Sequence, residues 1–188
     1  MKADLHNHSY YSDGLLSPSE LVRLASKGGC DLFSLTDHDT TDGLTEAHLE
    51  ADKVGLNLIN GVEISAFWRN MAIHIIGLGI DINNDTLQSG LEHNKELRKI
   101  RAEKIALSLW RSGIKDALAK AQDISGGHML TRTHFAQMLI QEGYCKDMKS
   151  VFRRYLTGKK PGGVRVEWKG LDEVINWIQS AGGKAFIA

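Results

Sequence analysis

The stretch Lys2–Ser9, with the sequence KADLHNHS, is predicted to form the first strand of an α/β fold. A helix is expected to begin just after Ser17, because Ser17 suits the N-cap, proline follows it, and Glu20 can complete a capping box. The alternation continues with a helix at Gly43–Val54 and further strands at Cys30–Thr36, Leu56–Ile64 and Met71–Leu78. Helices between strands imply parallel pairing, although the strand at Met71–Leu78 follows too closely for a crossover.

The middle of the chain, from Asn84 to Lys160, changes to a mostly helical pattern, clearest at Asp147–Leu156. A short strand at Val164–Val166, a helix at Leu171–Ala181 and an apolar strand at Lys184–Ala188 are then expected. This predicts three parts: residues 1–82 as the N-terminal part of a barrel, 83–162 as a helical insertion, and 163–188 as a truncated return to the barrel.

Composition excludes several classes of protein. The chain has 188 residues, of which 42% are hydrophobic and 24% charged, the balance of a folded globular domain. No apolar stretch approaches the roughly 20 residues of a membrane span, and the first residues lack the apolar core of a signal peptide. Two cysteines, Cys30 and Cys145, provide no disulfide framework. A cytoplasmic location is therefore expected.

The zero net charge hides an asymmetry along the chain. Residues 1–80 hold 11 acidic and 5 basic residues, a net charge of −6, whereas residues 81–170 hold 10 acidic and 17 basic residues, a net charge of +7. This pattern favours cations bound by the first part and anions by the second, with an ordinary solvated surface as the alternative.

The acidic part contains six candidate metal ligands, most of them at or just beyond the end of a predicted strand, where α/β folds build their sites. They are His6, His8, Asp13, His38, Glu63 and His74. Imidazole and carboxylate without thiolate suit Zn²⁺, Mn²⁺ or Fe²⁺, and six ligands suggest two or three ions. Clustered divalent ions are suited to phosphoester hydrolysis. The alternatives are a core position for His74 and a buried ion pair for Glu63.

Asp37 and Asp39 flank His38, and either could orient its ring from outside the ligand set. In the basic part, Arg132 and His134 lie where a helix is expected to begin after Thr131 or Thr133. A helix N-terminus and an arginine together favour phosphate binding.

On these residues the chain resembles the PHP (polymerase and histidinol phosphatase) family of metal-dependent phosphoesterases. The matching motifs, in the family's order, are Asp4–Ser9, Ser12–Gly14, Thr36–Thr40, Gly61–Ser65 and His74–Gly79. Arg132–Phe135, followed by the Asp147–Leu156 region, further resembles the branch that contains 3′,5′-nucleotide bisphosphate phosphatases and 5′→3′ exoribonucleases acting on short RNA.

The resemblance implies an α/β fold, a distorted (β/α)7 TIM-like barrel that is incomplete here, with an inserted helical subdomain and a trinuclear metal site. The implied ligands are His6, His8 and Glu63 for one metal, Glu63 and His74 for a second, and Asp13 and His38 for a third. Asp13, His38 and Glu63 would be the catalytic residues, and Arg132 and His134 would face the substrate phosphate. The implied reaction is attack of a metal-bound hydroxide on phosphorus, with the leaving alkoxide stabilised by metal or protonated by histidine.

The family's later ligands, a His-Pro pair and an Asp-x-His motif, are absent, so a fragment of a longer enzyme is expected. The leading hypothesis is a hydrolase that uses two to three divalent ions on nucleotide 3′,5′-bisphosphates or short oligoribonucleotides, because a polyanion gains most from the basic region. The alternatives are a histidinol-phosphatase-like enzyme acting on a small metabolite and a catalytically inactive metal-binding fragment. Neither a membrane nor stable duplex nucleic acid is an expected partner.

Overall fold

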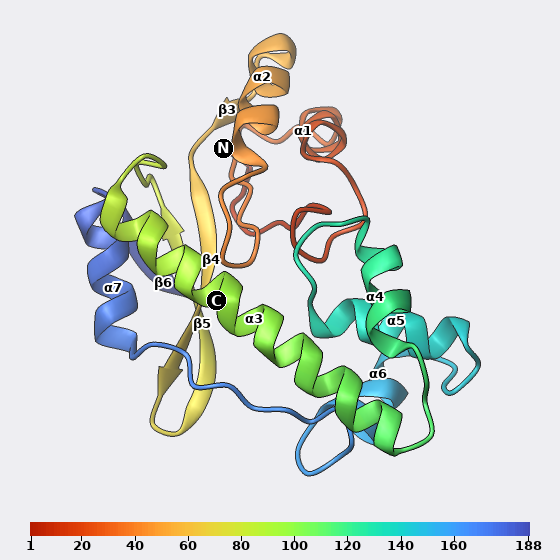
Figure 1. Ribbon diagram of the computed structural model, residues 1–188. Coiled ribbons are helices and arrows are strands. Elements are labelled where there is room, and N and C mark those ends of the chain that lie inside the picture. The colour runs from red at the N-terminus through yellow and green to blue at the C-terminus, as the bar shows by residue number, and fades with distance from the viewer. The chain divides into compact units, whose positions relative to one another are not determined.

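The computed structural model describes all of residues 1–188, which fold into two compact units. The first unit comprises residues 1–95 and 167–188, and the second comprises residues 96–166. Both β-sheets belong to the first unit, whereas the second is helical; the long helix α3 (Asp85–Arg111) runs from one into the other (Figure 1). No helix is long and apolar enough to cross a membrane.

The first sheet is parallel, with its strands in the order β1 (Ala3–Asp4), β2 (Leu32–Phe33), β3 (Asn57–Leu58). Helices α1 (Pro18–Lys27) and α2 (Leu44–Val54) form the crossovers and pack against each other (Figure 1). The predicted capping box is confirmed, since Ser17 Oγ accepts from the Glu20 amide and the Glu20 side chain accepts from the Ser17 amide. Parallel pairing between these strands is also confirmed.

The first strand is much shorter than the predicted range Lys2–Ser9. Beyond Asp4 the regular ladder ends. The Asn7 carbonyl still accepts from the Thr36 amide at 2.9 Å, but the Asn7 amide donates to Thr36 Oγ1 at 3.0 Å and the Ser9 amide donates to Asp37 Oδ1 at 2.7 Å. His6 and His8 therefore lie on an irregular segment beyond the strand.

The second sheet is antiparallel, in the order β4 (Gly61–Trp68), β5 (Met71–Leu78), β6 (Lys184–Ile187). A tight turn at Arg69 and Asn70, both with positive φ, joins β4 to β5. Helix α7 (Leu171–Ser180) packs on this sheet and buries Val174 and Ile178 against it (Figure 1). The predicted strand Met71–Leu78 is confirmed, whereas the predicted strand Leu56–Ile64 is divided between β3 and the start of β4.

The two sheets meet where the segment after β2 runs beside β4. His38 and Glu63 form an isolated parallel bridge, the Asp39 amide donates to the Glu63 carbonyl at 2.8 Å, and the Glu63 amide donates to the Asp37 carbonyl at 3.1 Å. We refer to this junction, residues 37–39 against Glu63, as the seam. The fold is thus mixed α/β, built from two three-stranded sheets, and no closed barrel is found.

The second unit contains the later part of α3 with α4 (Ala117–Ser125), α5 (Arg132–Gln141), α6 (Met148–Val151) and a π-helical turn, η1 (Phe152–Leu156). Its core is formed by apolar side chains from all of them, among them Ile105, Leu109, Phe135, Leu139 and Val151. The predicted strand at Val164–Val166 is wrong, because the chain there is irregular and no other strand lies in this unit to pair with it.

Candidate metal centre

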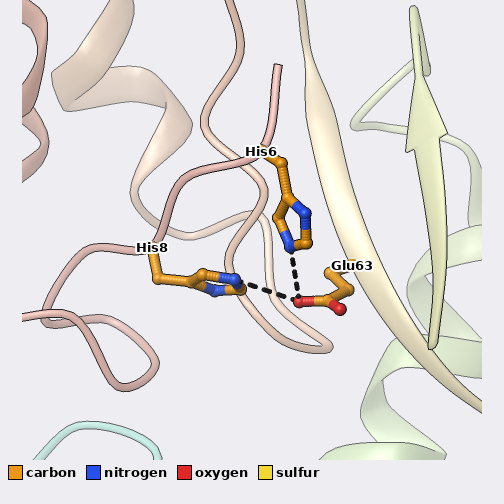
Figure 2. A group of neighbouring side chains, drawn as sticks. All are labelled: His6, His8 and Glu63. Carbon is orange, nitrogen blue, oxygen red and sulfur yellow. Dashed lines mark ion pairs between the residues drawn. The ribbon is translucent and has the colours of Figure 1, made fainter. Parts of the chain in front are cut away.

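The centre of the candidate site is Glu63, a carboxylate on β4 that is only 3% exposed. Its Oε2 lies 3.3 Å from His6 Nε2 and 3.1 Å from His8 Nε2, and Figure 2 shows both rings directed at this oxygen. His38 Nδ1 also lies 3.1 Å from Oε2, and His74 Nδ1 lies 2.9 Å from Oε1. Four imidazoles from three segments of the chain therefore surround one carboxylate.

Asp13 lies at one side of this cluster, beside two of the imidazoles. Its Oδ1 is 3.8 Å from His8 Nδ1, and its Oδ2 is 3.9 Å from His38 Nε2. The rings of His8 and His38 are neighbours, with centroids 4.6 Å apart. The structure thus brings together all six side chains that the sequence proposed as ligands.

These side chains form three overlapping groups, in each of which the possible ligand atoms lie within 4.8 Å of one another. The groups are His6, His8 and Glu63; His8, Asp13 and His38; and His38, Glu63 and His74. The first group has the composition that the family resemblance implies for one metal. His8, His38 and Glu63 each belong to two groups. The Glu63 carboxylate has two oxygens and could serve neighbouring cations, whereas each neutral imidazole can give its one lone pair to a single cation.

The donor set fits a divalent cation on geometric grounds. Glu63 Oε2 is buried and accepts no hydrogen bond, although three imidazole nitrogens lie within 3.3 Å of it. A buried carboxylate oxygen without a hydrogen-bond donor is costly, and a cation between oxygen and nitrogen lone pairs removes that cost. Imidazole with carboxylate is also the ligand chemistry that zinc, manganese and iron prefer.

The electrostatics of the site depend on Glu63. Burial by itself would raise the pKa of the Glu63 carboxyl, but the contacts with His74 and His8 and the charge of His38 outweigh burial and hold that pKa far below its usual range. Burial opposes the charged form of His8 as well, yet Glu63 and Asp13 together raise the pKa of its imidazole. In the absence of metal, protons therefore compete for the same nitrogen atoms that a cation would use.

The register of the β4–β5 hairpin places His74 in the cluster. Ser65 is paired with His74, so His74 lies on the same face of the sheet as Glu63. His74 is therefore half-buried beside a carboxylate, and the alternative of a core histidine is wrong.

The two aspartates beside His38 accept hydrogen bonds from groups in other segments of the chain. Asp37 accepts hydrogen bonds from Ser9 and Ser12, in the segment that carries His8 and Asp13. Asp39, with a positive φ of 49°, accepts from the amide and hydroxyl of Ser65 and from Asn94. Both aspartates thus connect neighbouring segments to the seam.

The predicted phosphate-binding residues lie in the second unit, at the start of α5. Thr131, one of the two residues that the sequence offered, is the N-cap, and its Oγ1 accepts from the Thr133 amide at 3.1 Å. His134 is buried, and its Nδ1 accepts the Thr131 amide at 3.0 Å, so this nitrogen completes the cap. The guanidinium of Arg132 lies 5.5 Å from the centre of the Phe152 ring.

Two further arginines beside Arg132 were missed by the sequence analysis. Arg98 and Arg101, one turn apart on α3, line a small hollow together with Arg132 and Phe135. Burial, followed by the positive charges of Arg132 and Arg98, lowers the pKa of Arg101 to about 9, and its Nε has no hydrogen-bond partner. On a helix this rich in charge the sequence predicts only a solvated face. The packing of Arg98 and Arg101 beside Arg132 is seen only in the structure.

A mixed α/β fold with imidazoles gathered around a buried carboxylate is the arrangement of a protein that can hold divalent cations. Comparison with known proteins identifies it further: the chain belongs to the PHP domain family, which it matches over residues 4–183.

Relatives with curated names support the membership. The chain is 44% identical over 98% of its length to a 3′,5′-nucleoside bisphosphate phosphatase of Chromobacterium violaceum, and 41% identical over 98% of its length to the 5′-3′ exoribonuclease Rnm of Escherichia coli. It spans 65% of the length of the first of these relatives and 64% of the second.

Solved structures show the same fold. An amidohydrolase from Chromobacterium violaceum, solved with bound sulfate and no metal, superposes with a TM-score of 0.95 at 42% identity, covering all of this chain and 66% of that one. A structure described as a metal-dependent phosphoesterase, from Bifidobacterium adolescentis, superposes with a TM-score of 0.87 at 24% identity. The superposition covers all of this chain and 66% of that one, and at this identity it supports the fold alone.

Proposed function

We propose that this chain carries the metal-binding part of a hydrolase that cleaves phosphate esters of nucleotides, either nucleotide 3′,5′-bisphosphates or short oligoribonucleotides. The observation that carries the proposal is the convergence of four imidazoles on the Glu63 carboxylate, with Asp13 beside them. The names of the relatives, a bisphosphate phosphatase and an exoribonuclease, support the same class of substrate. The complete fold proposed with it is the distorted (β/α)7 barrel with a helical insertion.

Two to three divalent ions, Mn²⁺, Zn²⁺ or Fe²⁺, would be held by the six side chains in the three groups described above. When bound, such ions supply Lewis acidity, which activates water and neutralises charge on the phosphoryl oxygens. Glu63 orients the four imidazoles around it, and Asp13 holds His8 and His38 from the other side. Asp13, His38 and Glu63 are therefore the proposed catalytic residues.

Arg132 is the proposed contact for a substrate phosphate, with His134 beside it. A guanidinium binds phosphate with two parallel hydrogen bonds, and Arg98 and Arg101 line the same hollow and add positive charge. The second unit has 15 basic and 6 acidic residues, a net charge of +9, which favours a substrate with several phosphates.

The test combines elemental analysis with phosphate release. We expect purified protein to hold at least two equivalents of metal and to release phosphate from adenosine 3′,5′-bisphosphate with Mn²⁺. Arg132→Ala should raise KM strongly for the bisphosphate and little for an aryl phosphate. Equal effects on the two substrates would indicate a general small-metabolite phosphatase, whereas metal-poor, inactive protein would indicate an inactive fragment.

A further inference from the structure

Asp37 is a buried carboxylate, 2% exposed, whose contacts the proposed reaction does not use. Its Oδ1 accepts the Ser9 amide at 2.7 Å and the Ser12 hydroxyl at 2.6 Å, and its Oδ2 accepts the Ser9 hydroxyl at 2.6 Å. Both serines are fully buried. Short hydrogen bonds to a carboxylate are the strong kind, so this network fixes both hydroxyls in one orientation.

The orientation of the Ser12 hydroxyl determines what it can offer to His8. Its single proton is donated to Asp37, so the Ser12 oxygen can act toward other groups only as an acceptor. That oxygen lies 3.4 Å from His8 Nδ1. A carboxylate oxygen of Asp13, at 3.8 Å from the same nitrogen, is also an acceptor.

Two acceptors facing Nδ1 assign the proton of the His8 ring to that atom. Nε2 is then the nitrogen that offers a lone pair, and it is Nε2 that lies 3.1 Å from Glu63 within the first ligand group. A hydrogen bond to the distal ring nitrogen is the usual way in which a protein fixes the tautomer and orientation of a metal-binding histidine.

We propose that Asp37 is a positioning residue that acts through the Ser12 hydroxyl on His8, holding the ring with Nε2 toward the cation site. The proposal rests on the metal site of the proposed function and adds to it a chain of contacts from Asp37 to Ser12 to His8.

The alternative is that Asp37 only folds the loop that carries Asp13. The loop is closed by its own backbone, since the amides of Ser12 and Gly14 both donate to the Ser9 carbonyl. It also closes tightly, because a Cβ on Gly14 would lie 1.9 Å from the His8 carbonyl oxygen. A purely structural role would lower stability without a selective effect on metal affinity, and this difference can be measured.

The variants are Ser12→Ala, Asp37→Asn and their combination, with Ser65→Ala as the matched control. Ser65 is also a fully buried serine, and it donates its hydroxyl to a buried aspartate, Asp39, at 2.9 Å. Mn²⁺ binding is measured by titration calorimetry on the whole chain, and stability by urea denaturation in the presence of EDTA.

We expect Ser12→Ala to weaken Mn²⁺ binding by about 10- to 100-fold, the usual effect of removing an outer partner of a ligand. Ser65→Ala should change it by less than about threefold at a similar loss of stability. Because Asp37 acts through Ser12, the double variant should bind Mn²⁺ no more weakly than Asp37→Asn alone.

Equal Mn²⁺ affinities for Ser12→Ala and Ser65→Ala would overturn the proposal, as would additive losses in the double variant. If Asp37→Asn does not fold, the Mn²⁺ affinities of Ser12→Ala and Ser65→Ala still test the proposal. Failure of the proposed metal site itself would be seen separately, as the absence of Mn²⁺ binding by the wild-type chain, and it would overturn this inference as well.

Discussion

Replacing Glu63 by glutamine should remove two of three cation-binding events and spare the third. Glu63 contributes a ligand atom to two of the three groups, whereas Asp13 contributes to one. Loss of an outer partner alone costs about 10- to 100-fold in metal affinity, so loss of a buried charged ligand should cost at least about 100-fold. That factor corresponds to about 2.7 kcal/mol for each affected cation.

The assay is titration calorimetry with Mn²⁺ on the wild type, Glu63→Gln and Asp13→Asn, with elemental analysis of the same samples. Both substitutions keep the size of the side chain and remove one charge, so they are matched in chemistry and differ in position. We expect Asp13→Asn to lose only the event that involves Asp13 and His38. Identical binding curves for the two variants, or full occupancy in Glu63→Gln, would refute the assignment of Glu63 as the shared ligand.

Three more outcomes are expected. Sulfate should raise the Tm of the wild type by a few degrees by binding beside Arg101, and Arg101→Ala should abolish this shift in thermal unfolding. Without metal, two groups make the stability depend on pH. Glu63, whose pKa is lowered, stabilises the fold above about pH 4.5, and this contribution is lost as the pH falls through the lowered value. His8, whose pKa is raised, stabilises the fold below about pH 6.5, and this contribution is lost as the pH rises through the raised value. Urea denaturation in EDTA should therefore show these contributions together between about pH 4.5 and 6.5, and a gain in stability above pH 8 would contradict this. Asn94→Ala removes bonds of 2.7 Å to Asp39 and 3.0 Å to the Ser65 carbonyl, so the free energy of unfolding should fall by about 2–4 kcal/mol in a urea titration, whereas an unchanged midpoint would contradict the role of these bonds.

The ligand set could be predicted from the sequence because most of its members follow a strand or a recognisable turn. His38 and Glu63 lie on the two sides of the seam, and strand-end reasoning brought them together without any structure. His74 was the ambiguous member, since an imidazole within an apolar run is equally compatible with a core. Its place was decided by the two-residue turn at Arg69 and Asn70, which sets the register of β4 against β5.

Contacts between side chains far apart in the sequence could not be predicted. From the sequence either aspartate beside His38 could orient that ring, and nothing predicted that Asp37 binds serines from a segment 25 to 28 residues earlier. The same limit applies to Arg98 and Arg101, whose spacing on α3 is compatible with a solvated helix face. The predicted strand Lys2–Ser9 was too long for a related reason, because the amides of Asn7 and Ser9 donate to the side chains of Thr36 and Asp37.

The seam has a consequence for how the first unit holds together. Only a few backbone contacts join the parallel sheet to the antiparallel sheet at residues 37–39, yet His6, His8 and His38 lie on one side of it and Glu63 and His74 on the other. A cation bound by residues from both sides is therefore a cross-link between two sheets that the backbone joins weakly. Chelation would therefore remove a link between the two sheets as well as the bound cation, and it should lower the stability of the first unit.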